Sequence, residues 1–142
     1  MKEKKIYLVS VWVYTQRTRP VKKEEHYYAV RATGYRAAQN AATRKFTADG
    51  YDVEVACVER DDHGDYGEYG APITAGTKEE LETLKDNVRK RIAKYEAAID
   101  ATNRLTDSEL AGLSYIDMAW RLLDGHALNV AKEKLAALEA VK

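Results

Sequence analysis

The stretch Lys5-Ile-Tyr-Leu-Val-Ser-Val-Trp-Val-Tyr-Thr15 decides the fold. Its β-branched and aromatic residues predict a strand. Alternate side chains of that strand form two faces: Ile6, Leu8, Ser10, Trp12 and Tyr14 on one, and Tyr7, Val9, Val11 and Val13 on the other. A strand that is apolar on both faces is expected at the centre of a sheet, with other elements covering each side.

Residues 25–60 predict a strand, a helix and a strand beside this central strand. A basic turn at residues 17–23 leads to a strand over 25–32. We expect a helix over 35–48, with Thr33 as its N-cap and Gly50 as its stop. Residues 51–60 then form a third strand with Cys57 facing the core, and a right-handed crossover makes it parallel to the second strand.

From Thr77 onward the pattern is helical. Capping boxes begin at Thr77 and Thr106. An apolar stripe at helical spacing follows the first box, a second helix is predicted to end at Asp124-Gly125, and a last helix begins near Ala127. The sequence therefore predicts an α+β fold: a three-stranded sheet of β-β-α-β order over 1–76, followed by a helical hairpin or three-helix unit over 77–142, packed together as one domain. The helices either cover their own sheet, over Leu8, Trp12 and Tyr27, or pair with another subunit.

Composition narrows the class of protein. Lys plus Arg and Asp plus Glu both number 23, so the formal net charge is zero, which disfavours nucleic acid as a partner. Residues 1–23 nevertheless have a local balance of +6, and residues 52–68 one of −6. These blocks either compensate each other on a solvated surface or steer partners and identical subunits. A single cysteine, no signal peptide and no membrane-spanning run predict a cytoplasmic protein without disulfides.

Residues 61–76 predict a long loop, rich in glycine, tyrosine and acidic residues. Glycine gives mobility and tyrosine gives contact area with a polar tip, which is typical of binding loops. His63, Tyr66 and Tyr69 are therefore candidate partner-binding residues, and the alternative is an exposed linker. The acidic residues around His63 do not match a calcium loop, because Tyr66 stands where an EF-hand needs glycine. We predict no metal and no cofactor.

The basic turn is the second candidate site. Arg17 and Arg19 follow Trp12 and Tyr14, so they could hold a phosphate while an aromatic ring stacks on a base; Arg31 is a third candidate anion ligand. The alternative is a hairpin turn kept soluble by its charge. His26 is expected at the edge of the core, so the sequence supplies no catalytic residue.

The segment from Tyr27 to Glu59 contains Ala-Val-Arg-Ala, an alanine-rich helix and Gly-Tyr-Asp-Val-Glu-Val. It resembles small accessory α+β proteins of bacteriophages, and the resemblance implies an inhibitor of a host enzyme or defence component. The strand Ile6-Tyr7-Leu8-Val9-Ser10 is also loosely similar to one in phage S-adenosylmethionine lyases. The segment that carries the catalytic tyrosine and glutamate of those lyases has no match here.

Together these features favour binding over catalysis. We expect a homo-oligomeric, non-enzymatic protein that inhibits or sequesters a host protein. The alternative is a nucleotide-like small molecule bound, or turned over, at a subunit interface. Neither function requires a membrane.

Overall fold

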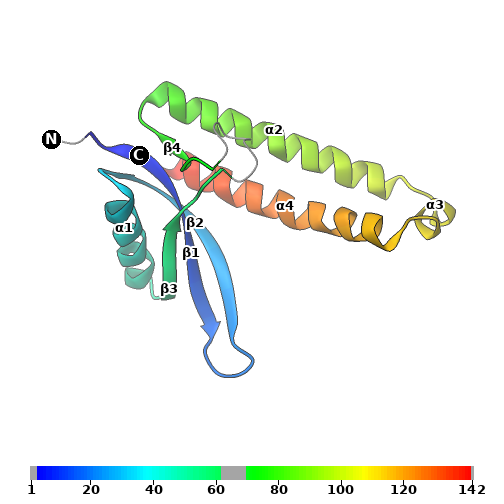
Figure 1. Cartoon of the computed structure of the whole chain (residues 1–142), viewed down its shortest axis with the longest axis horizontal. Helices are drawn as coiled ribbons and strands as arrows, with labels where there is room; N and C mark the ends of the chain where they lie inside the picture. Colours follow the sequence, from blue (N-terminus) through cyan, green and yellow to red (C-terminus); the bar gives the residue numbers. More distant parts are fainter. Residues whose placement is uncertain (1–2, 62–69, 142) are drawn as a thin grey trace.

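A four-stranded antiparallel sheet separates one short helix from a long helical hairpin (Figure 1). This is a computed structural model, and it describes residues 3–61 and 70–141. The elements in chain order are β1 (Lys5–Gln16), β2 (Lys22–Ala32), α1 (Tyr35–Ala48), β3 (Asp52–Val58), β4 (Thr74–Ala75), α2 (Lys78–Asn103), α3 (Asp107–Ala111) and α4 (Tyr115–Ala140). The predicted α+β class and the β-β-α-β order of the first four elements are confirmed.

β1 is the central strand. β2 pairs with one of its edges and β3 with the other, both antiparallel to β1. β2 and β3 are therefore parallel to each other across β1, as the crossover through α1 predicts.

The sheet has a fourth strand that the sequence analysis missed. β4 pairs antiparallel with Ile6 and Tyr7 of β1, beyond the end of β3. The prediction of three strands, with residues 70–76 in a loop, is therefore wrong. Two residues are too few to show a strand period, although the nearly complete burial of Ile73 and Ala75 explains why this segment is apolar.

The two faces of β1 build two separate cores. Tyr7, Val9, Val11 and Val13 pack against the alanine face of α1. Ile6 and Leu8, on the other face, pack against buried residues of the hairpin, among them Leu84, Val88 and Leu138. The helical region therefore covers the sheet of its own chain.

Three helix boundaries differ from the prediction. The helix that follows the Thr106 box ends at Ala111 and α4 begins at Tyr115, whereas the sequence predicts one helix as far as Asp124-Gly125 and another from near Ala127. Gly34, not Thr33, is the N-cap of α1, without a side-chain cap bond. α4 runs without interruption through Gly125, where the sequence predicts a break. A glycine inside a helix costs only about 0.5–1 kcal/mol relative to alanine, which packing of the flanking turns can offset. Gly50 ends α1 as predicted, with a φ of 93°.

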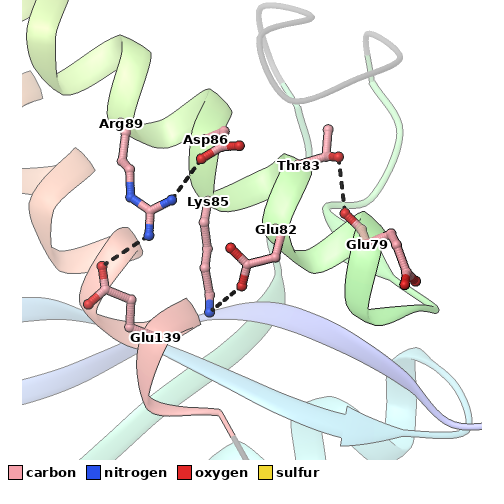
Figure 2. A network of polar contacts seen from close by, with 7 residues as sticks. All are labelled: Glu79, Glu82, Thr83, Lys85, Asp86, Arg89 and Glu139. Carbon is pink, nitrogen blue, oxygen red and sulfur yellow. Dashed lines mark hydrogen bonds and ion pairs between the residues drawn. The ribbon is translucent and has the colours of Figure 1, made fainter.

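Ion pairs along α2 fasten its sheet-proximal turns (Figure 2). Lys85 pairs with Glu82 within α2. Arg89 contacts Asp86 at 2.7 Å and reaches across to Glu139 of α4 at 3.9 Å. Pairs near the surface contribute at most about 1 kcal/mol each, and of these three only Arg89–Glu139 joins α2 to α4.

The hairpin extends well past the sheet (Figure 1). The buried residues of α2 are Leu81, Leu84 and Val88, and those of α4 are Ala131 and Leu138. All of them lie in the half of each helix that is nearer the sheet, so the distal halves of these two helices contribute no buried residue. Although α2 and α4 each have 26 residues, no helix in the described part of the chain is long and apolar enough to cross a membrane.

Candidate binding cleft beside Trp12

The hairpin covers only half of its sheet face. Along β1, Leu8 is 1% exposed and Ser10 is 4% exposed, but Trp12 is 38% exposed. Trp12 pairs with Glu25 of β2 and with Val55 of β3, which is 40% exposed. The helices therefore cover Leu8 and much of Tyr27 and leave Trp12 and Val55 open to solvent.

A cleft of about 480 Å³ lies where this exposed part of the sheet meets α4. The lining residues are Trp12, Glu24, Glu25, His26, His126, Asn129, Val130 and Glu133. The charged side chains among them are three glutamates, without any lysine or arginine. The cleft therefore combines an aromatic side chain with negative charge, which suits a cationic or amphipathic group better than an anion.

Glu25 is held rigidly at the floor of the cleft. One of its carboxylate oxygens accepts a hydrogen bond from the Ser10 hydroxyl and the other accepts one from the Tyr27 hydroxyl, each at 2.5 Å. Burial is the main cause of a raised pKa at Tyr27, and the hydrogen bond to Glu25 raises this pKa further. The Tyr27 hydroxyl therefore stays protonated and keeps donating its hydrogen bond. The Glu25 carboxylate is thus held in place by two side-chain hydrogen bonds.

A separate charge network lies at the end of the sheet next to the β1–β2 turn. The Arg17 guanidinium forms a two-bond ion pair with Asp52, its Nη2 donating to Oδ1 at 2.7 Å, and lies 4.3 Å from the centre of the Tyr14 ring. Lys23 lies 2.5 Å from Glu54. Two cations of the basic block are thus paired with two anions of the acidic block within one chain.

These pairs change the titration of their members. The hydrogen bond from Arg17 lowers the pKa of Asp52, and that from Lys23 lowers the pKa of Glu54. The hydrogen bond to Glu54 raises the pKa of Tyr14. An anionic ligand at Arg17 would have to displace Asp52 first.

The structure brings together only some of the predicted site residues. Trp12, Tyr14 and Arg17 follow one another along the open half of the sheet face, and Arg19 is exposed in the adjoining turn. Arg31 pairs with Ile6 at the opposite end of β2, so it does not belong to this site. His63, Tyr66 and Tyr69 lie outside the described residues, and the hypothesis that they bind a partner stays a prediction.

Two other expectations have clear outcomes. Cys57 is exposed, so the prediction of a core thiol is wrong. Cys57 pairs with Ser10 and Val55 pairs with Trp12, so both lie on the same face of β3. The hairpin leaves this part of β3 uncovered. His26 is a core-edge residue as predicted, with its ring 5.7 Å from that of Phe46 and 5.1 Å from that of Tyr51.

The sequence analysis missed the contribution of α4 to the cleft. Val130 and Glu133 reach the site only because of the angle at which the hairpin crosses the sheet, and no local pattern encodes that angle. Within residues 3–61 and 70–141, no group of three or more His, Cys, Asp or Glu side chains could hold a metal ion.

Comparisons of the chain with protein-family models, curated proteins and solved structures gave no match.

Proposed function

We propose that the chain is a non-enzymatic binding protein whose sheet face around Trp12 receives a segment of a protein partner. The observation that supports this is the open half-face itself: Trp12 and Val55 are exposed side by side on the sheet, next to a cleft of about 480 Å³. Exposed aromatic residues on rigid elements are common anchors of protein interfaces.

The charge of the cleft suggests the chemistry of the partner. Glu25, Glu133 and Trp12 all line the cleft. A lysine or arginine of the partner would gain both an ion pair and a cation–π contact there. We therefore expect a partner segment that presents basic and apolar side chains.

A binding role agrees better with this geometry than a catalytic one. Both oxygens of Glu25 already accept hydrogen bonds from side chains of the protein, so the carboxylate is held in place by the fold. A nucleotide-like ligand, the alternative, brings phosphate groups that the glutamates would repel. An inhibitor of a host component, the role implied by the resemblance to phage accessory proteins, is one form that such binding could take.

A fluorescence-anisotropy titration tests this proposal. The probe is a labelled peptide of alternating lysine and leucine, with a glutamate-leucine peptide of the same length as its charge control. We expect wild-type protein to bind the basic peptide, with an affinity that falls as salt rises. Trp12→Ala should weaken binding at least about tenfold, whereas Tyr115→Ala, which removes another exposed aromatic residue, should not.

Equal binding of both peptides, or equal binding by the Trp12→Ala variant, would contradict the proposal. Circular dichroism of each variant establishes that the fold is retained. A thermal-shift screen with nucleotides tests the alternative, because a specific ligand raises the melting temperature.

A further inference from the structure

The distal end of α4 exposes an apolar patch that the proposed function does not use. Six large side chains of its first three turns are open to solvent: Tyr115 at 90%, Ile116 at 66%, Met118 at 37%, Trp120 at 66%, Leu122 at 76% and Leu123 at 53%. We refer to these six residues as the distal patch. No element of the described chain covers them.

The area of the distal patch exceeds what a monomer usually exposes. If a fully exposed side chain of this size presents about 150–200 Å², these exposures amount to roughly 600–800 Å². The largest apolar patch on a typical monomer is about 300–600 Å². One side of a standard protein interface covers about 800 Å². The distal patch is therefore large enough to be one half of a stable interface.

Its architecture also requires a cover. The distal halves of α2 and α4 contribute no fully buried residue, and two helices alone cannot enclose a core. Four helices can, in the geometry of a four-helix bundle. A second hairpin of the same kind would supply the missing two helices.

The charges around the distal patch permit it to meet an identical surface. Residues 115–123 contain one acidic and one basic side chain, so their net charge is zero. The two are also engaged within the chain: Asp117 accepts a hydrogen bond from the Ser114 hydroxyl, and Arg121 donates one to Thr102 of α2. A two-fold interface brings each surface against its own copy, and here it would bring no excess of like charge together.

A pocket beside the distal patch adds a receiving surface. It has a volume of about 290 Å³ and lies between α2, α3 and α4, where Ile99, Leu110 and Met118 are among its lining residues. Tyr115 and Trp120, on the same helix as Met118, are exposed. Aromatic side chains that enter pockets of the partner are typical of strong interfaces.

We propose that the distal patch is the dimer interface of the protein, and that its occupant is the distal patch of a second copy. The two hairpins form a four-helix bundle by two-fold symmetry, with a sheet domain at each end. This inference rests on different residues from those of the Trp12 cleft, so either one can fail without the other.

Light scattering on a size-exclusion column tests the dimer. The chain mass is 16.0 kDa, so wild-type protein at about 100 μM should elute at twice that mass and dissociate on dilution. Leu122→Asp places a charge at the centre of both halves of the interface and should raise the dimer dissociation constant on the order of 100-fold. The matched control is Val21→Asp, which changes a 49% exposed residue of the β1–β2 turn and should leave the dimer intact.

Several outcomes would overturn the proposal. A wild-type mass of 16.0 kDa at all concentrations would show that the distal patch does not pair with itself. A dimer that survives Leu122→Asp, or that Val21→Asp disrupts equally, would place the interface elsewhere. The dilution series requires no variant, so a mass of 16.0 kDa at all concentrations overturns the proposal even if Leu122→Asp fails to fold.

Discussion

Replacing Gly125 by alanine should stabilise the protein, because this glycine lies in the middle of α4 rather than at its end. A β-carbon built at Gly125 meets no heavy atom within 4 Å, and its φ is not positive. Alanine would therefore fit without strain. It would also remove the backbone entropy that glycine loses on folding, and the expected gain is about 0.5–1 kcal/mol.

The gain can be converted to a melting temperature. The entropy of unfolding is about 2.1 cal/mol/K per residue, or on the order of 300 cal/mol/K for a chain of this length. A gain of about 1 kcal/mol should therefore raise the melting temperature by about 3 °C. Differential scanning calorimetry measures this shift, and a repeat at tenfold lower protein concentration separates folding from association.

Gly50→Ala is the matched control, since the same methyl group should have the opposite effect there. Gly50 has a φ of 93°, a conformation that costs alanine about 1–2 kcal/mol. Gly125→Ala should thus raise the melting temperature and Gly50→Ala should lower it. A loss of stability in Gly125→Ala would mean that α4 is interrupted at Gly125 after all, as the Asp124-Gly125 pair alone suggests.

Two further predictions concern the core and the charge network. Leu138→Ala removes a fully buried side chain and should lower the free energy of unfolding, measured in urea melts, by about 2–5 kcal/mol. Leu122→Ala, at a 76% exposed position, should change it by less than about 0.5 kcal/mol at low protein concentration. Similar losses in both variants would contradict the assignment of Leu138 to the core. Asp52 and Glu54 have folded-state pKa values below their ordinary values of 3.8 and 4.5, so their pairs stabilise the fold at neutral pH and this stability is lost as the pH falls through the lowered values. As the pH falls from about 5 to about 3, the free energy of unfolding of the double variant Asp52→Asn, Glu54→Gln should therefore decrease less steeply than that of wild type. If both proteins show the same pH dependence of stability at low salt, the ion pairs do not persist in solution.

The central strand, its two faces and the long helix α2 could be predicted because each depends on a local period. Alternation in β1 places Val9 and Val11 in one core and Leu8 in the other, as the sequence predicts. The capping box at Thr106 forms both of its hydrogen bonds. In these places the local signal and the tertiary structure agree.

The errors occur where long-range packing decides. β4 is two residues long and exists because β1 has an unpaired edge beyond β3. Cys57 and Trp12 have apolar neighbours in sequence, but their exposure depends on how far the hairpin reaches across the sheet. Glu25 and Glu133 line the same cleft although more than one hundred residues separate them in the sequence, and no local motif predicts such a long-range arrangement.

The position of β1 between two cores has a consequence for how this chain can be divided. Residues 1–76 and 77–142 differ in their secondary-structure pattern, but Ile6 and Leu8 belong to the hairpin core while Val9 and Val11 belong to the α1 core. A fragment that stops before α2 would expose Ile6 and Leu8 to solvent, and an isolated helical hairpin would lose the sheet that it packs against. Cleavage or truncation near Gly76 should therefore yield two aggregation-prone fragments rather than two folded ones. Expression and engineering thus require the intact chain.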